Sequence, residues 1–523
     1  MTGRPRAKDA MAAAAPHPDS RSAAGGRNPW MIAVVVSMAT FMEVLDTSIA
    51  NVSLRHIAGN LAATQDESTW VLTSYLVSNA IVLPLSGWLA TVVGRKRFYM
   101  GCVLLFGVSS FLCGFAPSLS WLIFFRVLQG LGGGGLAPSE QSILADTFPA
   151  AQRGQAFALY GVAVVVAPTL GPTLGGWITD SYSWRWVFFI NVPVCLLSLV
   201  LSWRLLVDPP AVRRDREEAW RGGLRVDYLG IILVAVGLGC LQVVLDKGQE
   251  DDWFGSPFIV CFIIIAALAL GFLVVWELVC DDPIVDLPLM RDRSFSAAML
   301  VMFVTGFILI STTQLLPQFL QDMLHYTATQ AGLALTAGGF ATLMVMPLSA
   351  ALLKKIQPKY LIAAGLAIES AACLHLHGFN TQITFWHAAV ARILQAVGLP
   401  LLFVPISTAA YSNLPPAKSN NASALINTMR NLGGSFGISV GVTLLARRGQ
   451  FHHSRLGETI SAYSRLHPAR GASALQGLGQ LVHRQAVMLS YLDVFWFVAL
   501  VAAAAIPVAF VLRHTHGRAE AGH

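Results

Sequence analysis

The stretch FRVLQGLGGGGLAP, residues 125–138, returns in altered form as ARILQAVGLPLLFVP, residues 391–405. Both segments are apolar, and both carry an Arg and a Gln three residues apart. An ionised side chain costs roughly 2.5 to 3.5 kcal/mol at the centre of a membrane, so chance similarity between apolar helices is a poor account of two copies. We interpret the segments as equivalent helices of a repeated unit. The pairs are Arg126 with Gln129 and Arg392 with Gln395.

The repeat extends on both sides of this pair. PLSGWL at Pro84 resembles PLSAAL at Pro347, and Gly171 matches Gly437 at the offset of 266 that relates Arg126 to Arg392. We therefore predict an all-α polytopic membrane protein, with two six-helix pseudo-symmetric halves and two inserted central helices. The predicted divisions are 29–207 for the first half, 208–290 for a loop and the inserted helices, and 291–512 for the second half.

Composition indicates the same class of protein. Of 523 residues, 55% are hydrophobic and 12% are charged, and the mean hydropathy is +0.61, which excludes an ordinary soluble globule. The net charge of +7 lies in loops beside apolar spans, so it predicts topology and no nucleic-acid partner. The seven cysteines form no CxxC pair, and neither a disulfide framework nor a metal site is expected.

Apolar stretches of about 20 residues predict 14 transmembrane helices. Lys and Arg concentrate in the loops on the side of the N-terminus, so both termini are expected in the cytoplasm. Residues 1–28 and 513–523 are predicted to be cytoplasmic tails, and 446–486 a long periplasmic loop. The spans are predicted to begin near Trp30, Trp70, Phe98, Trp121, Gln155, Val187, Tyr228, Pro257, Phe295, Ala331, Tyr360, Ile383, Ser423 and Val487.

The first span, FMEVLDTSIANV at residues 41–52, contains two acids, Glu43 and Asp46, on one helix face. A carboxylic acid in a low-dielectric cavity can alternate between its protonated and charged forms as access switches sides, which is the chemistry of proton coupling. We predict this role for Asp46 first and Glu43 second. The alternative is that they are structural partners of a buried Arg, or that Glu43 lies at a water-filled wall.

Three arginines, Arg126, Arg392 and Arg430, fall within predicted spans. Arg126 does not deprotonate, but its charge can hold an acid ionised or release it to bind a proton, so we assign it a control role in coupling. The alternative is that it pins two helices through backbone carbonyls. Glu140, Glu369 and Asp322 are weaker candidate acids because each could lie near a helix end. The predicted substrate cavity comprises Thr47, Asn51, Gln129, Glu140 and Gln314.

Two stretches predict moving parts. GVAVVVAPTLGPTLGG, residues 161–176, combines prolines and glycines that permit a bend and close helix approach, and GWLATVVGRKRF, residues 87–98, forms a tight basic loop. Close packing and topology alone are the plain alternatives. The predicted gate and hinge residues are Gly87, Gly94, Arg95, Pro168, Gly171, Pro172, Gly175 and Gly176.

Taken together, these motifs resemble those of the fourteen-helix drug:proton antiporter family (EmrB/QacA type) of the major facilitator superfamily. LDTSIANV at residues 45–52 resembles its first-helix signature, 126–132 its fourth-helix motif, 161–176 its antiporter motif, and RRGQFHHSRLGE at 447–458 the loop between its last two helices. The chain departs from the family where Thr91 replaces the loop-motif Asp and Arg55 replaces a Pro.

The resemblance implies a major facilitator fold and a proton-driven multidrug efflux permease of the bacterial inner membrane, not an enzyme. It would export lipophilic compounds by alternating access and need no cofactor beyond the proton gradient. It also implies partners: an EmrA-like periplasmic membrane-fusion adaptor and an outer-membrane channel. Two alternatives stay open, an exporter of a native metabolite or siderophore with the same fold and, from another class, a membrane enzyme or sensor.

Overall fold

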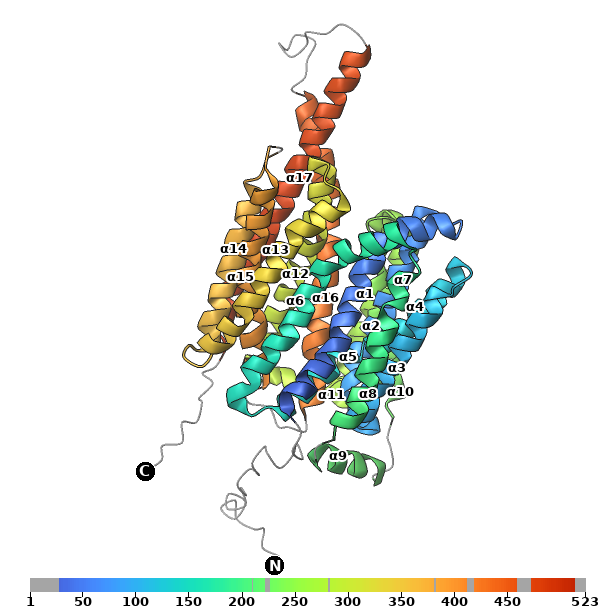
Figure 1. Ribbon diagram of the computed structural model, residues 1–523, viewed down its shortest axis with the longest axis vertical. Coiled ribbons are helices and arrows are strands. Elements are labelled where there is room, and N and C mark those ends of the chain that lie inside the picture. Colours follow the sequence, from blue (N-terminus) through green and yellow to red (C-terminus); the bar gives the residue numbers. More distant parts are fainter. Residues whose placement is uncertain are drawn as a thin grey trace, which may run out of the picture.

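The computed structural model describes residues 28–208, 210–221, 226–280, 283–380, 382–411, 418–458 and 472–512 (Figure 1). Every regular element in these ranges is a helix, which confirms the all-α prediction. Apart from Asn28, the predicted tails 1–28 and 513–523 lie outside the described residues.

The elements follow one another as long helices with short connections. The first half contains α1 (Pro29–Asn60), α2 (Gln65–Val93), α3 (Arg95–Gly114), α4 (Leu119–Gly133), α5 (Leu136–Thr147), α6 (Ala150–Ser181), α7 (Trp186–Phe189) and α8 (Asn191–Leu205). The middle contains α9 (Pro210–Arg221), α10 (Tyr228–Lys247), η2 (Trp253–Gly255), α11 (Pro257–Val279) and η3 (Leu287–Arg291). The second half contains α12 (Arg293–Leu324), α13 (Ala328–Leu352), α14 (Pro358–His377), α15 (Phe385–Tyr411), α16 (Ser419–Glu458) and α17 (Ala472–Ala509).

Thirteen spans in the described part of the chain are long and apolar enough to cross a membrane. They match thirteen of the predicted fourteen, and α16 lies where the remaining one was predicted. This helix is less apolar because it carries polar groups such as Asn427, Arg430 and Asn431. Packing against α12, α17 and α2 encloses its polar stretch within the bundle.

The helix pairs of the first half recur in the second. In the first half α1 packs on α6, α2 on α4, and α3 on both α4 and α8; in the second, α12 packs on α16, α13 on α15, and α14 on both α15 and α17. The helix starts repeat too: Thr64 with Glu67 caps α2, and Thr327 with Gln330 caps α13, each by reciprocal bonds. The halves meet where α6 packs on α13 and α2 on α16.

The inserted helices occupy one side of this interface. α10 contacts α2 of the first half and α16 of the second, and Ser435 Oγ of α16 donates to Gln242 Oε1 of α10 at 3.0 Å. α11 packs on α10 and exposes large apolar side chains such as Leu268 and Phe272. Such an apolar face is suited to lipid. α9 lies across the end of the bundle at which α1 begins, which is the predicted cytoplasmic end (Figure 1).

At the opposite end, α16 and α17 extend beyond the other helices as a projecting pair (Figure 1). Residues 446–486, which we predicted as a loop, are helical to Glu458 and again from Ala472. The predicted start of the last span, Val487, therefore lies fifteen residues inside α17. Hydropathy locates only the membrane-embedded part of a helix, so a polar continuation into water escapes it.

Glycine sets the closest approach in the second half. A Cβ added to Gly433 of α16 would overlap the Phe303 carbonyl of α12, and one added to Gly306 of α12 would overlap the Arg430 carbonyl of α16. Small residues allow helix backbones to approach this closely in a membrane.

Replacing Gly433 with Leu is expected to lower the unfolding free energy by about 1–3 kcal/mol, because the larger side chain must force α12 and α16 apart. Thermal unfolding of the purified protein measures this. Gly271→Leu is the matched control, since a Cβ there meets no heavy atom within 4 Å. Equal effects of the two substitutions would contradict close packing at Gly433.

Candidate functional site

Asp46 lies at the centre of the first half, 1% exposed, with both carboxylate oxygens bonded. Arg126 Nη1 of α4 donates to Oδ2 at 2.5 Å. Gln129 Nε2 donates to Oδ1 at 3.1 Å, and Asn191 Nδ2 donates to the same oxygen at 2.7 Å. Removing a charge from water is costly, and these charge-assisted bonds offset that cost for the carboxylate. The structure thus brings the predicted residues Asp46, Arg126 and Gln129 together.

The Arg126 side chain is also held from α2 and is fully buried. Its Nε donates to the Val71 carbonyl at 3.0 Å, and its guanidinium lies 4.3 Å from the Tyr75 ring centroid. The ion pair with Asp46 is compatible with the predicted control role of Arg126, and the bond to the Val71 carbonyl of α2 is compatible with the alternative, in which Arg126 pins two helices. A guanidinium keeps its charge, so Arg126 is the fixed cation of the pair.

Sequence reasoning missed Asn191. It opens α8, and its amide reaches both Asp46 and Ser110 Oγ of α3, the latter at 2.9 Å. An asparagine near a predicted span end is common, and only its position in space reveals its role. The polar residue inside an apolar run, NVPVC after Ile190, was the available signal.

Glu43, one turn before Asp46 on α1, has separate partners. Tyr75 Oη donates to Glu43 Oε1 at 3.0 Å, and Asn79 Nδ2 donates to the same oxygen at 3.2 Å. Asn79 also accepts a bond from Asn431 Nδ2 of α16 at 3.5 Å. Glu43 is thus connected to the second half through one amide.

Glu140 of α5 is fully buried, and Ser37 Oγ of α1 donates to its Oε1. Its Oε2 has no hydrogen-bond partner among the described residues. The predicted placement near a helix end, where water relieves the cost of a charge, does not apply to this side chain.

Arg430 links these acids across the two halves, a role that the sequence did not reveal. Its Nη1 on α16 donates to Tyr160 Oη of α6, and Tyr160 Oη donates to Asn427 Oδ1 at 2.9 Å. Arg430 also lies within electrostatic range of Glu43 and Glu140. A cation from one half therefore acts on two acids of the other, so a relative movement of the halves alters their electrostatic environment.

The predicted hinge segment of α6 packs on α1 beside the acids. Pro172 has no N–H for the Pro168 carbonyl one turn earlier, and Ser48 Oγ of α1 donates to that carbonyl at 3.0 Å. A Cβ on Gly171 would overlap Ser48, and one on Gly175 would lie 3.1 Å from Ile49 Cγ2. Gly176, by contrast, faces open space, so close packing does not require a glycine there.

The predicted gate residues lie at the contact between halves near the predicted cytoplasmic end. A Cβ on Gly87 would lie 2.5 Å from Asn421 Oδ1 of α16. Arg95 is 3% exposed; it pairs with Asp146 and donates to Ser419 Oγ of α16 at 3.1 Å. Asn420 Nδ2 donates to Thr91 Oγ1 at 3.5 Å, so a neutral contact stands where the family motif carries an acid.

Gly94 has a structural reason to be glycine. Its φ of +95° lies where other residues are strained, and it precedes α3. Asp208 Oδ1, from the segment before α9, accepts a bond from the Lys96 backbone N at 2.8 Å and so caps α3. The loop is therefore fixed to the linker as well as to α5.

The predicted cavity residues lie on four helices, α1, α4, α5 and α12. Gln129 and Glu140 are fully buried in separate clusters, as described above. Thr47 Oγ1 donates to the Val44 carbonyl of its own helix at 2.9 Å, and Asn51 and Gln314 are half-buried on α1 and α12. The lining of a substrate cavity stays a prediction.

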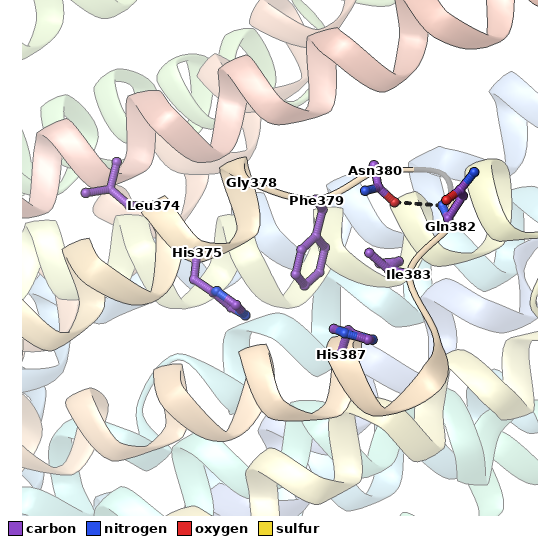
Figure 2. A pocket seen from close by; sticks show the side chains of 8 residues that line it. All are labelled: Leu374, His375, Gly378, Phe379, Asn380, Gln382, Ile383 and His387. Atoms are coloured by element: carbon purple, nitrogen blue, oxygen red, sulfur yellow. Dashed lines mark hydrogen bonds between the residues drawn. The ribbon is translucent and has the colours of Figure 1, made fainter.

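A cavity of about 440 Å³ opens elsewhere, at the junction of α14 and α15 (Figure 2). His375 and His387 face it from the two helices, with Phe379 between them. Two imidazoles are fewer ligands than a metal site needs, and no cluster of three or more candidate ligands occurs among the residues described. The cavity lies at the end of the bundle opposite α9, and none of its lining residues belongs to the Asp46 cluster.

Comparison with known proteins now decides the family. The model of the Major Facilitator Superfamily matches residues 36–438. The chain belongs to this superfamily. It is therefore a membrane transporter rather than an enzyme, as the sequence predicted, and a multi-pass protein of the bacterial inner membrane.

Curated relatives and solved structures agree with this assignment. The chain is 37% identical to the multidrug export protein EmrB of Escherichia coli, over 90% of this chain and 92% of that protein. It is 38% identical to the fatty acid resistance protein FarB of Neisseria gonorrhoeae, over 86% of this chain and 87% of that protein. A crystal structure of a double-tryptophan variant of XylE superposes with a TM-score of 0.62 at 14% identity, covering 94% and 97% of the two chains. The predicted EmrB-type resemblance and major facilitator fold are confirmed.

Arg126→Met is expected to lower the unfolding free energy by about 3–5 kcal/mol, because it leaves the Asp46 charge buried without its cation. Adding Asp46→Asn should recover part of that loss, since the orphaned charge is then removed. Thermal unfolding of the two single variants and the double variant forms a double-mutant cycle. Arg455→Met, at an exposed ion pair with Glu458, should change little. Additive losses in the cycle would contradict the ion pair.

Proposed function

We propose that this transporter is a proton-driven multidrug efflux permease, which exports lipophilic compounds by alternating access. Multidrug export and fatty acid resistance are the activities named for relatives that align over nearly the whole chain, and both concern compounds that partition into lipid. Such compounds reach the protein through the membrane itself. The proton gradient supplies the work, since about 2.3 kcal/mol is available per charge per 100 mV.

The observation that carries the proposal is the buried Asp46 carboxylate with Arg126, Gln129 and Asn191 as its donors. Three bonds to one carboxylate would be unnecessary for a packing residue that an apolar side chain could replace. An acid that gains a proton loses its attraction for Arg126, and the released guanidinium must then find other partners. Protonation of Asp46 thereby alters how α1 and α4 are held together.

Glu43 and Glu140 extend this coupling to the interface between the halves. Arg430 of the second half lies within electrostatic range of both acids while it bonds to Tyr160. When the halves separate at this point, the acids lose that cation and bind protons more readily. Proton uptake at Glu43 is thus linked to the change of access.

We place both termini in the cytoplasm, as the distribution of Lys and Arg predicts. On that assignment, the bonds from Arg95 to Ser419 and from Asn427 Nδ2 to Gln141 Oε1, the latter at 2.9 Å, join the halves on the cytoplasmic side. They hold that side closed in this conformation, and export requires them to break when a compound enters from within.

Asp46→Asn tests the coupling, because it keeps the size of the side chain and removes its titration. We expect substrate-dependent proton movement in proteoliposomes to be lost, with ethidium as the lipophilic cation. Asp180→Asn is the control, since Asp180 is exposed and pairs only weakly with His56. Normal proton-driven efflux by the Asp46 variant would overturn the assignment.

We further propose that the projecting pair formed by α16 and α17 binds an EmrA-like periplasmic adaptor, which joins the permease to an outer-membrane channel. Its described charges are mainly basic, including Arg447 and Arg455 on α16 and Arg484 on α17. Bonds to Asp493 Oδ2 from Arg448 Nε at 2.6 Å and His452 Nε2 at 2.7 Å stiffen its base. A rigid basic projection is suited to an acidic helical partner.

A photo-crosslinking amino acid at Phe451, 46% exposed on the projecting pair, is expected to capture the adaptor in native membranes. The same group at Phe340, 65% exposed on α13, should capture lipid and no adaptor. Mass spectrometry of the adducts distinguishes the two. Failure to find the adaptor at Phe451, or an equal yield at Phe340, would contradict this binding site.

A further inference from the structure

A fourth buried acid, Glu369 on α14, lies in the second half, away from the groups used above. It is 0% exposed and faces α15, where a Cβ added to Gly398 would lie 2.7 Å from its Oε1. Glycine at this position therefore makes room for the carboxyl group.

Neither oxygen of Glu369 makes a well-formed hydrogen bond to a described residue, although the backbone N–H of Leu399 lies near the carboxyl group. Its potential partner is Arg392 of α15, which is 1% exposed and lies within electrostatic range. Yet Arg392 donates elsewhere: Nη1 to Gln395 Oε1 and Nη2 to Thr313 Oγ1, both at 3.2 Å. Its Nε is buried without an acceptor in the described part of the chain.

The equivalent arginine of the first half shows the contrasting arrangement. Arg126 bonds to an acid on α1, whereas Arg392 bonds to the neutral Thr313 on α12, the helix that corresponds to α1. In the second half the acid comes from α14 instead and stands apart from its arginine. The same Arg-x-x-Gln frame thus holds a formed pair in one half and a separated pair in the other.

A buried carboxylate without a donor is expensive, whereas a neutral carboxyl group costs far less. The observed arrangement therefore suits a protonated Glu369. A change of rotamer could turn Arg392 from Thr313 towards Glu369. The carboxyl O–H bond would then break, its proton would pass to water, and a carboxylate would remain beside the guanidinium. The Cys373 thiol of α14 is a further titratable group within electrostatic range of Glu369.

We propose that Glu369 is a second proton-binding site, with Arg392 as the residue that controls its release. The contribution of this site to transport rests on the proposed proton coupling. Protonation of the Glu369 carboxyl group does not depend on that proposal, and it can be measured without any substrate.

Infrared difference spectra of the purified full-length protein in lipid nanodiscs, between alkaline and acidic buffer, report protonated carboxyl groups. We expect a carboxyl C=O band that is lost in Glu369→Gln and retained in Asp46→Asn. Glu458→Gln, at an exposed acid on α16, should leave it unchanged. An identical spectrum for Glu369→Gln and the unaltered protein would overturn the proposal.

Thr313→Val separates proton binding from mere packing. It removes one acceptor of Arg392, which should favour the pair with Glu369 and give a smaller carboxyl band at the same pH. A band unaffected by this change would show that Arg392 does not control the site and would overturn that part of the proposal. With ethidium in proteoliposomes, Glu369→Gln should lower the number of protons exchanged per substrate. If Asp46→Asn left coupling intact while the band remained, the primary coupling assignment would fail and Glu369 would stand.

Discussion

A buried charge pair, Asp46 with Arg126, is the constraint on which the first half depends. Two ions removed from water cost several kcal/mol each, and a shared set of partners offsets part of that cost. The set comes from five helices: Asp46 from α1, Val71 and Tyr75 from α2, Arg126 and Gln129 from α4, and Asn191 of α8 with its bond to Ser110 of α3. A change in the charge of Asp46 therefore alters a network of contacts that joins all five helices.

The acid-bearing helix is also bound to the helix that meets the second half. Pro172 frees a carbonyl on α6, and Ser48 on α1 satisfies it only two residues after Asp46. α6 in turn packs on α13 across the interface. On the proposed coupling, a rearrangement of α1 would reach the surface that faces the other half through these contacts.

The features that sequence predicted well are those that cost free energy in a membrane. Intramembrane charges and the repeated Arg-x-x-Gln pair stand out against an apolar background, so the fold and the Asp46–Arg126 association could be anticipated. The role of Asn191 could not be anticipated, because a polar residue near the end of a span costs little free energy and so does not stand out in the sequence. The partner of Arg430 could not be anticipated either, since Tyr160 lies 270 residues away in the sequence and only the packing of the two halves brings the residues together. Hydropathy identifies the residues that contact lipid and does not report where a helix ends. For this reason the sequence did not predict the helical extension past residue 446.

The two halves share a frame but differ in where the acid lies. Both halves carry the arginine and the glutamine, but the acid lies on α1 in one half and on α14 in the other, so the two arginines have different surroundings. α1 lies against α6 at the interface, whereas α14 packs on α15 and α17 within its own half. Asp46 thus lies on a helix that packs against the contact between the halves. Glu369 lies within the packing of the second half alone, so on the proposed coupling the two acids are expected to exchange their protons at different steps.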